Sequence, residues 1–200
     1  MKSLTLILAF LPLIAFSLLS RFLPNGYIGI AGLAAALIAL IAIATSHPVW
    51  PPKILNACSL VLFTLIAVLG FTLGKADDRW LATWGGAGVG LILGLIILAL
   101  VPVMPFTEQF AREATPQAYW ASPTFKRINR VLSAAWGLAI FAVGLSRVAA
   151  AAIDGHTTRR LPETLLGLVV PVVIIIYMLK FSKSYPDRVT REPAGAPVGH

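Results

Sequence analysis

The chain has 200 residues, of which 58% are hydrophobic and 12% charged, and its mean hydropathy is +0.86. Soluble domains carry about 25% charged residues, so this composition excludes an ordinary soluble globular protein and indicates an integral membrane protein. The net charge of +8 does not indicate nucleic-acid binding, because that function needs basic residues on a soluble fold with groove-reading or base-stacking elements.

Six apolar runs are long enough to form transmembrane helices, which need about 20 residues to cross a hydrocarbon layer roughly 30 Å thick. In chain order they span residues 3–20, 27–46, 54–74, 81–104, 131–151 and 164–181. Such spans leave no length for a soluble domain. We therefore predict an all-α fold in which residues 1–182 form one polytopic bundle of about six transmembrane helices, followed by a flexible cytoplasmic tail at residues 183–200.

Small residues recur at every fourth position in the fourth predicted span. Ala82, Gly86, Gly90 and Gly94 form this row. Such a row lets the backbone of another helix approach closely, so it predicts helix packing. The partner is either another helix of the same chain, which we favour because polytopic bundles pack themselves in this way, or a second copy in a homo-oligomer.

Two prolines, Pro12 and Pro171, lie inside predicted spans. Proline has no backbone N–H, so the carbonyl four residues earlier loses its helical partner. For Pro171 that carbonyl belongs to Gly167, and we expect a kink at this point of the last span.

One polar stretch interrupts the apolar runs, PFTEQFAREATPQAYWASPTFKRINR at residues 105–130. Glu108 and Arg112 lie one helical turn apart in the favourable order, and Phe106 and Phe110 share one face. This pattern predicts a short interfacial amphipathic helix in the loop between the fourth and fifth spans.

Helix-start signals flank this loop. Thr107 is a candidate cap for the short helix, and Ser122 followed by Pro123 is a cap and first turn for the fifth span. The fifth helix is then expected to begin near Pro123, about two turns before the hydrocarbon layer, and its extra turns carry basic side chains. These are Lys126, Arg127 and Arg130.

The loop has two interpretations. Aromatic rings and basic side chains pin loops to the membrane surface, where they contact anionic lipid headgroups. A loop of this length in a compact chain is also often functional, which favours a docking surface for a protein partner. Both interpretations use the same candidate residues: Phe106, Phe110, Arg112, Tyr119, Trp120, Lys126, Arg127 and Arg130.

The basic residues divide unevenly between the two sides of a six-span protein. One side holds Lys2, Lys53, Arg112, Lys126, Arg127, Arg130, Lys180, Lys183, Arg188 and Arg191, and the other holds Arg21, Lys75, Arg79, Arg159 and Arg160. The positive-inside rule places the richer side in the cytoplasm. Both termini and the loop are therefore predicted to be cytoplasmic.

The chain offers little catalytic chemistry. His47, His156 and His200 fall on both predicted faces and cannot form one site, and the pattern shows neither a nucleophile with its base nor a metal-ligand cluster. We expect no enzyme activity and no cofactor.

Arg147 is the single charge well inside a predicted span, and intramembrane charges are functional candidates because their burial is costly. It lies near the outer end, where its side chain can snorkel or pair with Asp154 or with the turn at Asp77 and Asp78. Asn56, near the cytoplasmic end of the third span, is a candidate for a hydrogen bond between helices.

Several stretches resemble one bacterial family. They are LAFLPLIAFSLL, FTLGKADDRWLATW, MPFTEQFARE and AYWASPTFKRINRVLSAAWGLAIFAVGL, with Asn129, Trp136 and Gly144 as the matching signature. The chain resembles intracellular septation protein A and its inner-membrane relatives, or a sister branch, since its PFTEQFARE segment is fuller and its tail longer. The resemblance implies a location in the bacterial cytoplasmic (inner) membrane and a link to envelope synthesis or division, and carries over no catalytic residue.

Two functions follow as hypotheses. The first is a non-catalytic scaffold whose cytoplasmic face contacts lipids and envelope or division proteins. The alternative is a small transporter or lipid-handling protein with a cavity near Asn56, Trp136 and Arg147. A filled bundle favours the scaffold, and a cavity within the bundle favours the alternative.

Overall fold

The computed structural model describes residues 8–23, 27–46, 52–73, 75–154 and 165–191. Within these ranges the chain is helical and forms no strand, which confirms the predicted all-α class for this part of the protein. The helices are α2 (Leu11–Phe22), α3 (Ile28–Ala44), α4 (Ile54–Thr72), α5 (Lys75–Leu100), α6 (Phe106–Arg112), α7 (Pro123–Asp154) and α9 (Val170–Arg191), with a 3-10 turn η1 (Gln117–Tyr119) and a π turn η2 (Leu165–Val169).

Four of the described helical segments are long and apolar enough to cross a membrane. They are Ile54–Thr72, Thr83–Leu100, Pro123–Ile153 and Leu165–Thr190. The segments Leu11–Ser20 and Ile28–Ala44 are apolar but shorter. The first predicted span begins in residues 3–7, which lie outside the described part.

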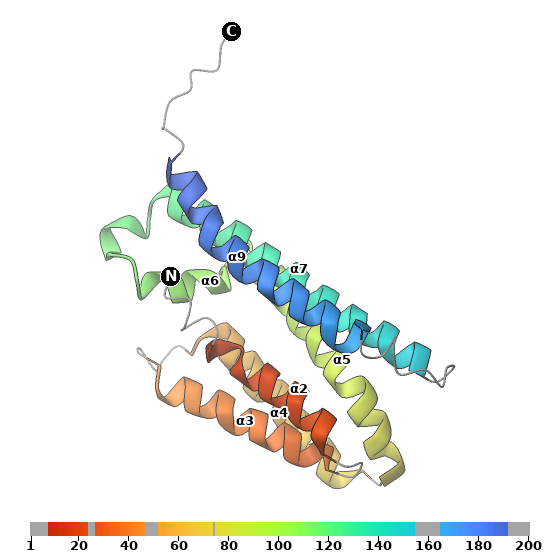
Figure 1. The fold of residues 1–200 in the computed structure, drawn as a ribbon. Helices are drawn as coiled ribbons and strands as arrows, with labels where there is room; N and C mark the ends of the chain where they lie inside the picture. Colours follow the sequence, from red (N-terminus) through yellow and green to blue (C-terminus); the bar gives the residue numbers. More distant parts are fainter. Residues whose placement is uncertain (1–7, 24–26, 47–51, 74, 155–164, 192–200) are drawn as a thin grey trace.

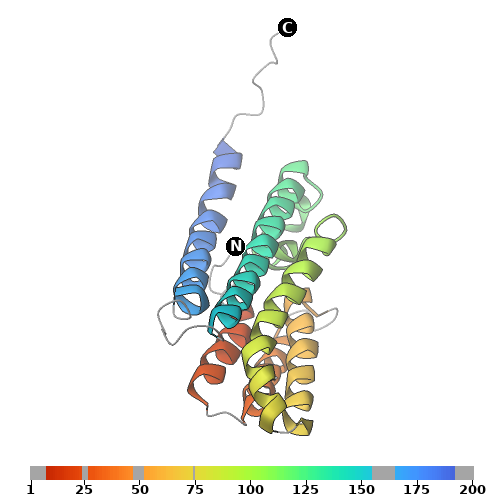
Figure 2. The same cartoon turned by 90° about the vertical axis from the view of Figure 1, so that its right-hand side faces the viewer.

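The helices run up and down between two ends of the bundle (Figure 1). One end, which we call the loop end, holds α6, the start of α7 and the end of α9; the α4–α5 turn lies at the opposite end. In the turned view, α9, α7, α5 and α4 follow one another across the molecule (Figure 2). The basic residues of the loop, of the start of α7 and of the end of α9 therefore lie at the loop end. This arrangement is expected when consecutive spans run in opposite directions.

Two pairs of helices meet at glycines, with their backbones in contact. A Cβ added to Gly70 of α4 would lie 2.5 Å from the backbone nitrogen of Gly29 of α3. Between α5 and α7, a Cβ on Gly90 would lie 2.9 Å from the Cα of Gly144, and one on Gly94 would lie 2.7 Å from the backbone nitrogen of Phe141. Both contacts need glycine, because any side chain would push the helices apart.

The row of small residues predicted in the fourth span thus faces α7 of the same chain at Gly90 and Gly94. The side chain of its first member, Ala82, lies outside the described residues. The second glycine contact, between α3 and α4, was not predicted. Its signal was present, since Gly29 and Gly32 are followed by alanines that are fully buried in the structure, Ala35 and Ala39.

Pro12 is the second residue of α2, where the first turn has no intrahelical use for the missing N–H. Pro171 is the second residue of α9, but the π turn η2 leads directly into α9, so a helical carbonyl does lose its donor there. The irregularity at the point where a kink was predicted is this π turn. In an i→i+5 pattern the carbonyl left without a donor is that of Leu166, and the Ser146 hydroxyl of α7 donates to it at 2.6 Å.

Helix α9 continues to Arg191, so residues 183–191, which the sequence analysis placed in the C-terminal tail, are helical. The rest of the predicted tail, residues 192–200, lies outside the described part. The polar sequence after Phe181 suggested an end to the span, but polar residues do not end a helix that extends beyond the hydrocarbon layer.

Candidate functional site

The predicted amphipathic segment is a seven-residue helix, α6, that packs into the loop end of the bundle. Its aromatic residues Phe106 and Phe110 are 2% and 4% exposed and belong to the same buried cluster as Leu55, Ile97 and Trp136. The apolar face therefore covers protein and not lipid, contrary to the interfacial interpretation. The helix also ends at Arg112.

Thr107 does not cap α6, as its sequence position had suggested. It lies within the helix, fully buried, and its hydroxyl donates to the backbone carbonyl of Asn129 at 2.9 Å. The Thr107 and Ser133 hydroxyls are 2.8 Å apart, and Ser133 Oγ accepts the Thr107 N–H at 3.1 Å. These bonds fasten α6 to the first turns of α7.

A second set of contacts fastens α6 to the start of α4. The Gln109 side-chain oxygen accepts the N–H of Ile54, at 2.9 Å, a helix-start donor with no intrahelical partner. The Lys53 ammonium lies 2.6 Å from a Glu113 carboxylate oxygen and 4.8 Å from the centre of the Phe110 ring. The first half of the loop is thus a structural strap between α4 and α7.

The rest of the loop is more exposed. The predicted Glu108–Arg112 pair forms at 2.6 Å, and the Arg112 guanidinium also lies 5.0 Å from the centre of the Trp120 ring. The Trp120 indole N–H donates to the carbonyl of Thr115 at 2.9 Å, and Tyr119 is 61% exposed.

The fifth long helix begins where the sequence predicts. The Ser122 hydroxyl accepts the N–H of Phe125 at 3.2 Å, which is an N-cap bond, and α7 starts at Pro123. Three basic side chains on its first turns are exposed. They are Lys126, Arg127 and Arg130.

The three residues that carry the family resemblance have different places in the bundle. Asn129 is buried and its side-chain N–H donates to the Phe125 carbonyl at 2.9 Å. Gly144 meets Gly90 of α5. Trp136 lies in the core, where it connects three helices as described below. All three contribute to packing, and they do not form one site.

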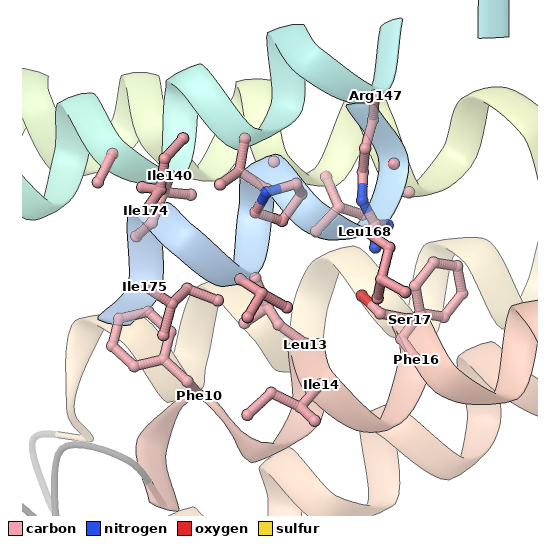
Figure 3. Close-up of a pocket in the computed structure, with 18 of the residues that line it drawn as sticks. Phe10, Leu13, Ile14, Phe16, Ser17, Ile140, Arg147, Leu168, Ile174 and Ile175 are labelled. Atoms are coloured by element: carbon pink, nitrogen blue, oxygen red, sulfur yellow. The ribbon is translucent and has the colours of Figure 1, made fainter. Parts of the chain in front are cut away.

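A cavity of about 420 Å³ lies between α2, α5, α7 and the η2–α9 segment. Its long sides are α2 and α9, with α7 behind, and we call it the α2–α9 slot (Figure 3). On α7 its lining follows one helix face: Trp136, Ala139, Ile140, Val143 and Arg147. The volume is within the usual range of small-molecule sites, about 300–1,000 Å³.

The slot opens sideways along α2 and α9. The lining residues Ile14 and Leu18 of α2 are 38% and 48% exposed, and Leu168 and Val172 of the facing segment are 41% and 44% exposed. The segments that contain α7 and α9 are long and apolar enough to cross a membrane, and a membrane around them would meet this opening with its hydrocarbon layer.

One end of the slot is polar. Arg147 projects into it toward Ser17 and Phe16 of α2 (Figure 3). A Cβ on Gly86 would lie 2.8 Å from Nη1 of Arg147 and 3.4 Å from the Phe16 ring, so this glycine makes room for the guanidinium. Gly86 was predicted as a packing residue, and its neighbour is a charged side chain.

The other end is apolar and closed. The Trp136 ring stacks on Phe10, the residue before α2, with ring centres 4.7 Å apart, and its indole N–H donates to the Ser182 hydroxyl of α9 at 2.8 Å. Arg147 and Trp136 are 11 residues apart, or roughly 16 Å along a helix. The slot therefore has a cationic end and an apolar end separated by about half the roughly 30 Å hydrocarbon layer.

Of the three residues that the sequence analysis named for a cavity, Trp136 and Arg147 line the slot. Asn56 does not line it. It is buried on the first turn of α4, where its side-chain oxygen accepts no hydrogen bond from the described residues. The analysis missed Phe10 and Ser17, although both lie on the face of α2 that includes Leu13 and Ile14.

Over its described residues the protein is helical, with four segments long and apolar enough to cross a membrane and a lateral slot that has one charged end. No family model, no curated protein and no solved structure matches this chain. The resemblance to intracellular septation protein A therefore stays a prediction from the residues quoted above.

Proposed function

We propose that this protein is a lipid-handling membrane protein that binds an anionic lipid in the α2–α9 slot. One acyl chain lies along the apolar lining, and the acidic headgroup meets Arg147. The observation that supports the proposal most directly is the shape of the slot together with its chemistry: a laterally open apolar cavity of about 420 Å³ with Arg147 at one end.

The polarity of the lining favours an amphipathic ligand. Three lining side chains carry polar atoms, Arg147, Ser17 and Trp136. The Trp136 N–H is used by Ser182, which leaves the polar character at the Arg147 end. A guanidinium has five N–H donors, so Arg147 can keep a protein contact and still donate to a carboxylate or phosphate.

Depth along the helices supports a headgroup at Arg147. The guanidinium lies beside Gly86, about one turn inside the apolar segment Thr83–Leu100. That depth is near the boundary of the hydrocarbon layer, where headgroups begin. Arg147 is also at the end opposite the exposed basic residues of α7, so the proposed lipid belongs to the leaflet farther from the loop end.

Photolabelling tests this proposal. The protein would be reconstituted in phosphatidylcholine vesicles with palmitic acid or phosphatidylglycerol that carries a photoactivatable group on its acyl chain. We expect labelled peptides from α2, α7 and α9, and at least tenfold less label in Arg147→Gln, since hydrogen bonds to charged groups contribute about 1.5–3 kcal/mol.

The matched control is Arg127→Gln, which removes an exposed basic side chain from the same helix at its other end. It should label like the unchanged protein. Equal labelling of Arg147→Gln and Arg127→Gln, or label spread evenly over all helices, would contradict the proposal.

A second candidate function is a scaffold at the loop end. It is supported by the exposed cluster Lys126, Arg127 and Arg130 at the start of α7, close to the exposed Tyr119. In this proposal the loop end is cytoplasmic and contacts anionic headgroups and, if the family resemblance holds, an envelope-synthesis or division protein. The docking surface excludes Phe106 and Phe110, which are buried.

Two measurements test the scaffold. Neutralising Lys126, Arg127 and Arg130 together in the folded protein should change the proteins and lipids that crosslink to the loop in cells, and an unchanged set argues against docking. A cysteine placed at Thr115 should resist a membrane-impermeant reagent added outside intact cells, and modification would reverse the proposed orientation.

A further inference from the structure

We infer that Trp136 sets the length of acyl chain that the α2–α9 slot accepts. This inference rests on the proposed function and adds a specificity-determining residue to it. The ligand class is a single-chain anionic lipid whose chain ends against the Trp136 indole when its headgroup is at Arg147.

The lining residues nearest the loop end lie in or against one buried cluster. They are Trp136 of α7, Phe10 just before α2, and Leu179 of α9. No described residue closer to the loop end lines the cavity. Within the described residues, the slot therefore ends at the buried cluster that contains Trp136.

Trp136 is the residue that joins the elements at this end of the slot. Its ring stacks on Phe10 with ring centres 4.7 Å apart, which ties α7 to α2. Its N–H donates to Ser182 at 2.8 Å, which ties α7 to α9. The indole is 2% exposed and belongs to the buried cluster of the loop end. A side chain held from two directions cannot rotate aside without losing both contacts, so it acts as a fixed stop.

The distance between the two ends of the slot limits the length of acyl chain that fits inside it. Arg147 and Trp136 are separated by roughly 16 Å along α7, about the depth of one leaflet of a hydrocarbon layer near 30 Å thick. Lipid tails are as apolar as the lining, so each methylene in the slot gains from packing against fixed side chains and not from transfer out of water. Affinity compared at equal mole fraction in the bilayer should therefore rise with chain length as more of the lining is covered. Once the chain end reaches the indole, further methylenes have no apolar surface to cover and the gain stops.

The experiment measures binding of two series matched in chain length. One series is lauric, myristic, palmitic and stearic acid, which present a carboxylate, and the other is the lysophosphatidic acids with the same chains, which present a phosphate. Competition against the photoactivatable palmitic acid reports the affinity of each. The two series distinguish the two sources of the anionic group, and in both we expect affinity to rise with length and then reach a plateau.

Two variants move the stop in opposite directions. Trp136→Ala should shift the plateau to a longer member of the series, because the slot then extends toward the loop end. Ala139→Phe fills the slot about one turn nearer to Arg147 and should shift the plateau to a shorter member. The second variant keeps the indole and its contacts, so it tests the idea even if Trp136→Ala does not fold.

Ser182→Ala is the control for an indirect effect of Trp136 on stability. It removes the hydrogen bond but leaves the indole in place, so the plateau should stay where it is in the unchanged protein. A plateau that stays fixed in both Trp136→Ala and Ala139→Phe, while binding still depends on Arg147, would overturn the role of Trp136 and keep the proposed function. Absence of Arg147-dependent binding in the unchanged protein would overturn the proposed function itself.

Discussion

The α5–α7 contact and the α2–α9 slot show two outcomes for neighbouring apolar helices. Between α5 and α7 the backbones touch at Gly90 and Gly144. Between α2 and α9 a cavity of about 420 Å³ remains. Lipid tails are as apolar as leucine, so apolar character alone does not draw helices together in a membrane. What differs is the size of the side chains at the interface.

The sequences of the two pairs explain the difference. Helices α2 and α9 contain no glycine between Leu11 and Phe22 or between Val170 and Arg191, and the slot is lined by branched side chains such as Leu13, Val172 and Ile175. Branched side chains hold two backbones apart, whereas aligned glycines let them meet. A lateral slot can therefore persist beside a tightly packed pair within one bundle.

We expect the largest effect on stability from a substitution at the α5–α7 contact, where the two backbones touch. Gly90→Leu places a side chain where a Cβ alone would lie 2.9 Å from the Cα of Gly144. We expect a loss of about 3 kcal/mol or more, at the upper end of overpacking effects, measured as a lower melting temperature in detergent.

Gly88→Leu is its matched control, because a Cβ on Gly88 meets nothing within 4 Å. The control should be as stable as the unchanged protein or slightly more so, since leucine favours helix over glycine. Equal losses in the two variants would mean that the α5–α7 contact does not depend on glycine at that position.

The same chemical change at two alanines sharpens the comparison. Ala35 of α3 is 0% exposed, so Ala35→Leu should destabilise the protein by about 1–3 kcal/mol through overpacking. Ala139 lines the slot, so Ala139→Leu should cost less than about 1 kcal/mol while it lowers photolabelling by palmitic acid. Thermal unfolding and labelling of both variants measure the contrast, and a larger stability loss at Ala139 would show that the slot is not available space.

Removal of a buried hydrogen bond at the loop end should have an intermediate effect on the free energy of unfolding. Thr107→Val keeps the shape of the side chain but removes the hydroxyl that bonds to Asn129 and Ser133. Unsatisfied buried groups cost about 1–3 kcal/mol, and we expect a loss in that range. The comparison variant is Thr124→Val at an exposed position, which should leave the melting temperature nearly unchanged.

The smallest effect is expected at the exposed ion pair of α6. Arg112→Gln removes the ion pair with Glu108 and the contact with the Trp120 ring, but the arginine side chain is 49% exposed. Contacts of exposed side chains contribute little, so we expect a loss of at most about 1 kcal/mol. Lys53→Gln provides the contrast, since the Lys53 side chain is 12% exposed and contacts both Glu113 and the Phe110 ring. Its loss should be larger in the same unfolding measurement, and the reverse order would mean that the strap does not hold α4.

Local signals in the sequence were sufficient for the all-helical class and for the start of α7, but α5 begins at Lys75, earlier than the predicted residue 81. The cap at Ser122 and Pro123, the ion pair of Glu108 with Arg112 and the long fifth helix all depend on residues within a few positions of one another. Predictions that needed a distant partner were less successful. Thr107 was assigned to a local cap because its true partners, Asn129 and Ser133, lie on another helix.

The face of α6 shows the same limit. Phe106 and Phe110 have the spacing of an interfacial helix, and that spacing is identical whether the face covers lipid or protein. Only the position of Leu55 and Trp136 beneath them decides that the face is buried. The docking surface predicted from the loop is accordingly reduced to its exposed second half.

By itself, the sequence determined that the described part of this chain is a set of apolar helices, because length, hydropathy and local caps act within single helices. Tertiary structure alone decided which helices touch and which leave a space. Helix pairing depends on how glycines and branched side chains from distant segments align, and so it decided that Arg147, Ser17 and Trp136 share one slot.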